Sequence, residues 1–279
     1  LGDVYKRQFL ASASGAPGVT TAAGALALNW SKPVILVEAD TTKTSSIIPG
    51  LIRGQVYHST GLTEAAVADQ YGALTPDKLW EQTVELSPRS VLIPGFKSLQ
   101  GAAGAGPHFW RALLDALRPY ESAGYDILVD GGRLHVNDPR LPLLREADSI
   151  TLFTDRTLPS VAAVLAHWRS LDENRNTVPE WLLNTLNEIG HASYVDLLVT
   201  ERSTTQETWP LKTVTKQIGM NLLGTIPWDP KGAAIYSVGA PTLGAQRTPY
   251  SRAIGALLHS YSDVLNTRTY TTTDWEGQQ

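Results

Sequence analysis

Short apolar runs alternate with longer amphipathic stretches along the chain. The runs predicted to be buried strands are 9–13, 33–37, 90–93, 126–129, 149–153, 195–199 and 222–226, with a further strand near Leu182. The helices predicted between them include 19–30, 107–120, 158–171 and 250–265. Alternating strands and helices are typical of βαβ units. The pattern therefore predicts an α/β protein with a three-layer, doubly wound, mainly parallel sheet and helices on both faces.

The length of 279 residues fits one domain of this class. We expect that domain at residues 9–266, followed by a polar tail at 267–279. Residues 3–8 read D-V-Y-K-R-Q, which is what one frame of a transposon-end sequencing adapter would encode. Residues 1–8 are therefore predicted to be artefactual, with the native first strand clipped.

Composition narrows the function classes. The net charge of -4 and the pI near 5.9 provide no general attraction to nucleic acid or to an anionic membrane. The chain has no cysteine, which excludes disulfides and thiolate chemistry. It also has no apolar run long enough to span a bilayer. We expect a cytoplasmic protein without a membrane anchor and without a nucleic-acid partner.

The most informative segment for chemistry is the loop S-G-A-P-G-V-T-T at Ser14–Thr21. It follows a predicted strand and opens a predicted helix, so its backbone N–H groups and the helix dipole can attract an anion. A tight strand-to-helix turn, in which Pro17 and Gly18 serve only geometry, explains the same residues about equally well.

Two aspartates change that balance. Asp40 and Asp130 end predicted strands on the sheet edge where the glycine-rich loop must also lie. A Mg²⁺-nucleotide site needs one carboxylate to order metal-bound water and another to orient the attacking water. Aspartates that merely cap loops are the alternative. The coincidence of three features on one edge favours the nucleotide site.

Five segments together resemble the MinD/ParA family of P-loop ATPases, over residues 9 to about 258. They are, in order, G-A-P-G-V-T-T, V-I-L-V-E-A-D, Y-D-I-L-V-D-G-G-R, A-D-S-I-T-L-F-T and L-L-G-T-I-P-W-D-P. The resemblance implies a P-loop NTPase fold with ATP and Mg²⁺ as cofactors. It implies that the nucleotide is bound by Gly15, Ala16, Pro17, Gly18, Val19, Thr20 and Thr21. It further implies that Thr20 and Asp130 bind the metal, that Asp40 is catalytic, and that Pro227 and Trp228 border the adenine.

The loop departs from the family pattern K-G-G-x-G-K-[ST]. Ser14 stands at the signature-lysine position and Val19 at the ordinary P-loop lysine position. Losing two charge-assisted phosphate contacts costs roughly 3–6 kcal/mol, or about two to four decades in affinity. Thr200 stands where relatives often have an adenine-reading asparagine. Arg53, Lys43 and Arg133 are candidates to supply the missing charge.

The resemblance predicts a homodimeric nucleotide switch that positions a partner assembly and hydrolyses ATP weakly or not at all. Loops of this type with V-E-A-D look similar to a bacterial subgroup associated with Tad-type pilus or secretion loci. The first alternative is a pseudo-ATPase that serves as a nucleotide-independent dimeric scaffold. A chromosome or plasmid partition ATPase is less favoured, because the basic residues are scattered.

Two other features are assigned ordinary roles. The run G-A-A-G-A-G at Gly101–Gly106 is predicted to be a mobile loop rather than a second phosphate site, because it lacks the third glycine of the dinucleotide fingerprint. The six histidines are scattered, without H-x-x-x-H spacing, so we expect no zinc hydrolase.

Overall fold

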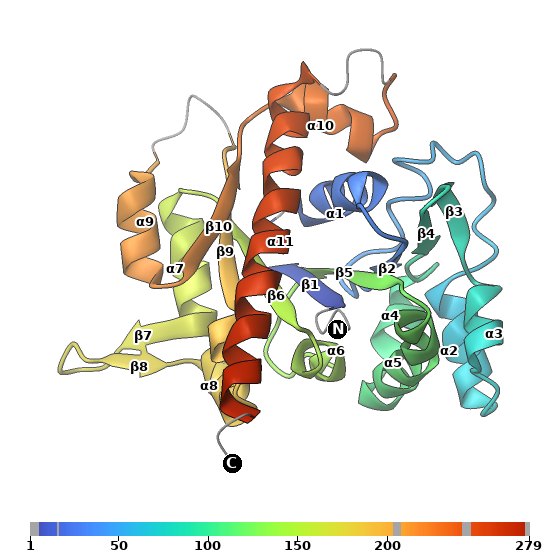
Figure 1. The fold of residues 1–279 in the computed structure, drawn as a ribbon, viewed down its shortest axis with the longest axis horizontal. Coiled ribbons are helices and arrows are strands. Elements are labelled where there is room, and N and C mark those ends of the chain that lie inside the picture. The colour runs from blue at the N-terminus through green and yellow to red at the C-terminus, as the bar shows by residue number, and fades with distance from the viewer. Residues whose placement is uncertain (1–5, 16, 203–207, 242–246, 277–279) are drawn as a thin grey trace.

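The computed structural model describes residues 6–15, 17–202, 208–241 and 247–276; for residue 193 and residues 264–276 it describes the backbone alone. Its centre is an eight-stranded sheet in the order β10-β9-β6-β1-β5-β2-β4-β3 (Figure 1). Every neighbouring pair is parallel except β3 and β4 at one edge. The prediction of a doubly wound, mainly parallel α/β fold is confirmed.

The sheet strands are β1 (Arg7–Ser12), β2 (Val34–Glu38), β3 (Val84–Ser87), β4 (Ser90–Ile93), β5 (Asp126–Arg133), β6 (Ser149–Thr154), β9 (Val195–Thr200) and β10 (Asn221–Ile226). A separate hairpin is formed by β7 (Arg169–Leu171) and β8 (Thr177–Pro179). The helices are α1 (Val19–Asn29), α2 (Leu62–Gln70), α3 (Pro76–Trp80), α4 (Leu99–Gly104), α5 (Pro107–Ser122), α6 (Leu141–Arg145), α7 (Leu158–Trp168), α8 (Trp181–Glu188), α9 (Leu211–Ile218), α10 (Pro230–Ser237) and α11 (Pro249–Glu276), with a short 3₁₀ turn at Ala192–Tyr194.

Alternating residues of the central strands face two separate cores. Leu10, Leu36 and Leu128 pack under α1, α10 and α11, whereas the helices from α2 to α9 cover the opposite face (Figure 1). This alternation follows from the pleat of a strand, whose successive side chains point to opposite faces. Both faces are apolar because helices cover both, which explains why the strands read as continuous apolar runs.

The predictions fail at two short elements. The strand predicted near Leu182 is the helix α8, in which Leu182 and Leu186 are buried one turn apart. The mobile loop predicted at Gly101–Gly106 is largely the helix α4, whose first turn is capped by the Ser98 hydroxyl, which accepts from the Gly101 N–H. Packing of the buried Ala102 and this cap override the low helix propensity of glycine.

The ends of the chain differ in detail from expectation. β1 begins at Arg7, and its Gln8 side chain is buried in the central sheet. The closing helix α11 extends to Glu276, beyond the predicted end at 265. The artefactual origin of residues 1–8 and the domain limits stay predictions. Within the described residues, no helix combines the length and apolarity needed to cross a membrane.

Candidate functional site

The loop between β1 and α1 has the backbone geometry of an anion-binding turn. Gly18 precedes α1 with φ 89° and ψ 23°, a left-handed conformation that favours glycine. No side chain caps this end of α1. The first-turn N–H groups of α1 therefore remain available to an anion, and the helix dipole favours negative charge there. Ala16, also predicted to bind nucleotide, lies outside the described residues.

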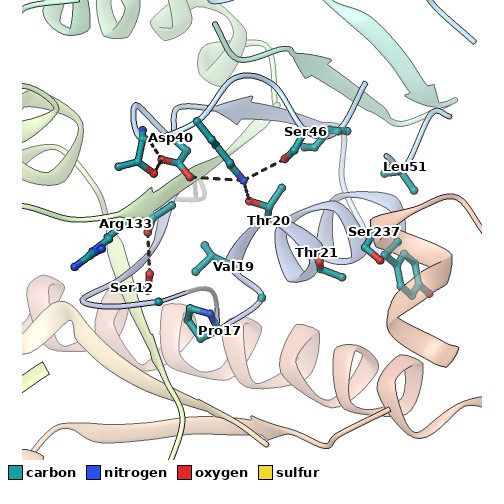
Figure 2. Close-up of a pocket in the computed structure, with 17 residues that line it drawn as sticks. Ser12, Pro17, Val19, Thr20, Thr21, Asp40, Ser46, Leu51, Arg133 and Ser237 are labelled. Atoms are coloured by element: carbon teal, nitrogen blue, oxygen red, sulfur yellow. Dashed lines mark hydrogen bonds and ion pairs between the residues drawn. The ribbon is translucent and has the colours of Figure 1, made fainter. Parts of the chain in front are cut away.

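The loop forms one wall of a cavity of about 610 Å³ (Figure 2). The predicted residues on its wall are Gly15, Pro17, Gly18, Val19, Thr20, Thr21 and Asp40. Other walls come from the segment after β2, from the last residues of β5 and from the end of α10. The structure thus brings the glycine-rich loop and Asp40 to one sheet edge, as the sequence predicted.

Asp40 is held from both sides. Its Oδ1 accepts hydrogen bonds from the Thr42 backbone N–H at 2.8 Å and the Thr42 hydroxyl at 2.7 Å. Across the cavity wall, a Cβ added to Gly132 would lie 2.1 Å from Asp40 Oδ2, so only glycine allows this approach. Gly132 also has φ 53°. The D-G-G sequence near the end of β5 therefore shapes the carboxylate pocket.

Asp130 lies beneath the cavity rather than on its wall. It pairs in register with Leu10 of β1 and Glu38 of β2 and is fully buried. Its Oδ1 accepts from the Gly132 N–H at 3.1 Å, while Oδ2 has no hydrogen-bond partner within the described part of the chain. Burial raises the pKa of Asp130 to about 6, and the nearby Lys43 charge and the Thr20 hydroxyl both oppose this rise.

Glu38 has a structural role that sequence reasoning did not anticipate. Its buried carboxylate accepts from the Ser45 hydroxyl at 2.5 Å, the Ser46 N–H at 2.6 Å and hydroxyl at 3.0 Å, the Ile47 N–H at 3.2 Å and the Gly95 N–H at 3.1 Å. These donors satisfy the buried charge. Glu38 thereby fixes residues 45–47, which flank the cavity, and does not face the cavity itself.

Lys43 places a positive charge against the predicted metal ligands. Its Nζ donates to Thr20 Oγ1 at 2.5 Å and to Ser46 Oγ at 3.1 Å, and it lies 3.6 Å from Asp40 Oδ2 (Figure 2). Of the three basic residues proposed to replace the missing lysines, Lys43 and Arg133 line the cavity and Arg53 does not. Ser14 does not line it either, whereas the buried Val19 does.

Arg140 and Asp138 also organise the site, and the sequence analysis missed both. Arg140 is fully buried, pairs with Asp138, and donates to the carbonyls of Ala39 at 3.0 Å, Arg133 at 2.8 Å and Gly131. It therefore ties the end of β2 to the end of β5. The Arg140 guanidinium holds the pKa of Asp138 below its usual range against the effect of burial.

A second cavity of about 400 Å³ adjoins the first. Pro17, Gly18 and Thr21 line both cavities. The second also contains the predicted adenine-border residues Pro227 and Trp228. Thr200, at the position of the family's asparagine, lies on the same wall.

Arg202 is a basic residue of this second cavity that sequence reasoning missed. It lines the cavity wall and pairs with Asp155 at 3.3 Å. A Cβ added to Gly15 would lie 3.9 Å from its guanidinium, which places this charge beside the glycine-rich loop. No sequence motif marked Arg202, because its partner Asp155 follows β6, which the fold pairs with β9.

The sheet, with its strand-loop-helix cradle at the carboxyl edge, has the fold of the MinD/ParA-type P-loop ATPases. The chain is similar to a ParA family ATPase from Chlorobium tepidum TLS, with 19% identity, a TM-score of 0.67 and coverage of 91% of this chain and 97% of that one. It is also similar to the septum site-determining protein MinD complexed with Mg-ADP from Pyrococcus horikoshii OT3, with 14% identity, a TM-score of 0.65 and coverage of 92% and 96%. A putative plasmid partition protein from Borrelia burgdorferi B31 bound to AMPPNP has 17% identity, a TM-score of 0.63 and coverage of 93% and 98%.

These likenesses, all below 25% identity, show the fold. No protein-family model and no curated protein matches the sequence.

Several oxygen atoms at this site are potential ligands of a magnesium ion. Thr20, Asp40 and the unpartnered oxygen of Asp130 are oxygen donors of the kind that Mg²⁺ prefers. However, the Lys43 ammonium already contacts Thr20 Oγ1, at 2.5 Å. A magnesium ion on the same oxygen, at about 2.1 Å, would lie within about 4.6 Å of that ammonium and be repelled by it. The site as folded therefore does not fit a divalent ion beside Thr20.

Proposed function

We propose that this protein is a nucleotide-binding switch of the MinD/ParA type that positions a partner assembly and hydrolyses ATP weakly or not at all. The observation that carries this proposal is the shared wall of the two cavities. Pro17, Gly18 and Thr21 lie on both, so one loop contacts a phosphate compartment and a base compartment. A nucleotide has the same two parts.

In this proposal the phosphates lie in the cavity of about 610 Å³, against the first-turn N–H groups of α1. The base lies in the cavity of about 400 Å³, between Pro227 and Trp228. The Trp228 side chain is 54% exposed, which leaves its ring face accessible for stacking. Arg202 and Arg133 contribute positive charge at the two ends of the groove.

Two observations support slow or absent hydrolysis. Val19 puts an apolar side chain where the family's lysine would neutralise charge in the transition state, and that interaction is a main source of rate in phosphoryl transfer. Asp40, the proposed catalytic carboxylate, is occupied by the two Thr42 donors and faces Lys43. Its capacity to orient water is correspondingly reduced.

Calorimetric titration of ATP and ADP into the purified protein tests nucleotide binding. We expect binding, and we expect Trp228→Ala to weaken it by about tenfold or more, because stacking on an aromatic ring contributes about 1–3 kcal/mol per base. Tyr71→Ala removes a ring of similar size that is 83% exposed and outside both cavities, and it should leave the affinity unchanged. The absence of binding to the wild type would reject the nucleotide proposal.

For the partner we propose a protein assembly such as a pilus or secretion system, served by a homodimer in the cytoplasm. The alternative is a nucleotide-independent dimeric scaffold. The contacts of Lys43 with Thr20 and Asp40 favour it, because the ammonium group has partners within the chain without a ligand. A role in chromosome or plasmid partition is the third candidate, and one structural neighbour is a putative plasmid partition protein.

A further inference from the structure

Lys43 occupies the region between the oxygen atoms that are potential ligands of a divalent ion. Its ammonium group is surrounded by the Thr20 hydroxyl at 2.5 Å, the Ser46 hydroxyl at 3.1 Å and the Asp40 carboxylate at 3.6 Å (Figure 2). The fully buried Asp130 belongs to the same cluster, and the Thr20 hydroxyl and the Lys43 charge both act on its carboxylate. Lys43 is thus the cation at a cluster of hydroxyl and carboxylate oxygens.

The neighbouring carboxylates differ in how their charge is balanced. Glu38 is satisfied by donors from Ser45, Ser46, Ile47 and Gly95 and needs no cation. Among the described residues, Lys43 is the basic side chain that pairs with Asp40, and it is also the positive charge that acts on Asp130. Removing that charge would leave buried carboxylates uncompensated.

We infer that Lys43 is a built-in replacement for the divalent ion, so that the site binds the phosphates of a nucleotide without Mg²⁺. The Lys43 side chain is 35% exposed and lines the phosphate cavity. Its ammonium group can therefore face an incoming phosphate while it keeps its hydrogen bond to the Thr20 hydroxyl. The ammonium group of a lysine is a compact point charge, and such a charge can bind a phosphate group directly. This role of Lys43 deepens the proposed nucleotide function and rests on it in one respect, namely that the ligand is a nucleotide.

The first test uses the protein without nucleotide. Lys43→Met removes the charge and keeps the length of the side chain; Lys78→Met is the control, because Lys78 pairs with Glu81 on the surface away from both cavities. We expect Lys43→Met to lower the melting temperature by several degrees and millimolar MgCl₂ to restore at least half of the loss. MgCl₂ should not change the wild type or Lys78→Met when ionic strength is matched with KCl.

Two results of this test would overturn the inference. One is that MgCl₂ stabilises the wild type as much as it stabilises Lys43→Met. The other is a Lys43→Met protein that folds and does not respond to MgCl₂. If Lys43→Met does not fold, Lys43→Gln takes its place, and the measurement on the wild type with Mn²⁺ and ADP described next stands without any variant.

The second test uses ADP as the probe. We expect the wild type to bind ADP with the same affinity, within about threefold, in EDTA and in MgCl₂. Paramagnetic resonance of Mn²⁺ should detect the same amount of bound ion in a mixture of wild type and ADP as in ADP without protein. In Lys43→Met, ADP should bind about tenfold more tightly with MgCl₂ than with EDTA, and Mn²⁺ should become bound.

The failures of the two proposals are distinguishable. A wild type that binds ADP about tenfold more tightly with MgCl₂, or that immobilises Mn²⁺ with ADP, retains a metal site and contradicts the role of Lys43. A protein that binds no ADP under any condition contradicts the nucleotide function, while the thermal experiment still decides whether Lys43 replaces the metal.

Discussion

Asp130 is the residue whose ionisation is most informative about the site. Burial raises its pKa from 3.8 to about 6, so the folded state favours the protonated carboxyl. The stability that this proton contributes is complete below pH 3.8 and is lost as the pH rises through about 6. At neutral pH the folded protein therefore contains a destabilising buried charge.

Asp130→Asn should remove this pH dependence. Above pH 6 the variant should exceed the wild type in free energy of unfolding by at most about 3 kcal/mol, and near pH 4 the difference should be small. Denaturant titrations from pH 4 to 7.5 without divalent ions measure it. Asp115→Asn, at an exposed position paired with Arg118, is the control. A difference that is constant with pH would contradict the prediction.

Val19 and Ser14 are the two positions of the glycine-rich loop that lack lysine. Val19 lines the phosphate cavity, so Val19→Lys with Ser14→Lys should restore charge to the loop. We expect nucleotide affinity to rise by about tenfold or more and phosphate release to rise above the wild-type background. Val67→Lys, on the surface of α2, is the control. If neither affinity nor rate changes, the cavity does not hold phosphates.

At the scale of whole elements, the sequence predicted the central strands well, because a strand covered on both faces is a continuous apolar run. Peripheral elements were harder. The segment around Leu182 is a short apolar run that fits a strand or a helix, and only its burial one turn from Leu186 decides for α8. The β7–β8 hairpin depends on the Asp172 carboxylate, which accepts from the backbone N–H groups of Asn174 and Asn176.

The site shows the same division. The glycine-rich loop and Asp40 were placed together from the sequence because parallel strands bring their carboxyl ends to one edge, whereas Pro227 and Trp228 were named only through the family resemblance. Lys43 was named only as one of three candidate charges, and Arg140 and Arg202 were missed, because the contacts of each depend on a side chain that reaches a different element. Lys43 reaches Thr20 on α1, and Arg140 reaches Ala39 after β2. Such contacts have no periodicity or local motif.

The strand β1 contains a buried polar side chain whose replacement should stabilise the fold. Gln8 is 1% exposed, and neither atom of its amide has a hydrogen-bond partner within the described structure. Gln8→Leu has a similar volume and removes the unpaired amide, so it should stabilise the fold by about 1–3 kcal/mol. Chemical denaturation measures this gain, with Gln55→Leu at an exposed position as the control. Loss of stability in Gln8→Leu would show that the amide is satisfied in solution.

At the scale of the whole molecule, association separates a switch from a scaffold. The family resemblance implies that Ser14 stands at the position of a signature lysine that reaches across a two-fold interface to the partner's nucleotide. Any dimer should then form through apolar and backbone contacts around the loop edge, in an isologous interface.

We therefore expect ATP to have little effect on dimerisation. Light scattering over a range of protein concentrations, with and without ATP and with MgCl₂ or EDTA, should give the same dimerisation constant in all conditions, because a ligand shifts assembly only if it binds the dimer and monomer differently. Ser14→Lys is the matched variant: it restores the lysine position and should make association respond to ATP. A wild type that becomes dimeric only with ATP would instead behave as a working switch and would remove the scaffold from consideration.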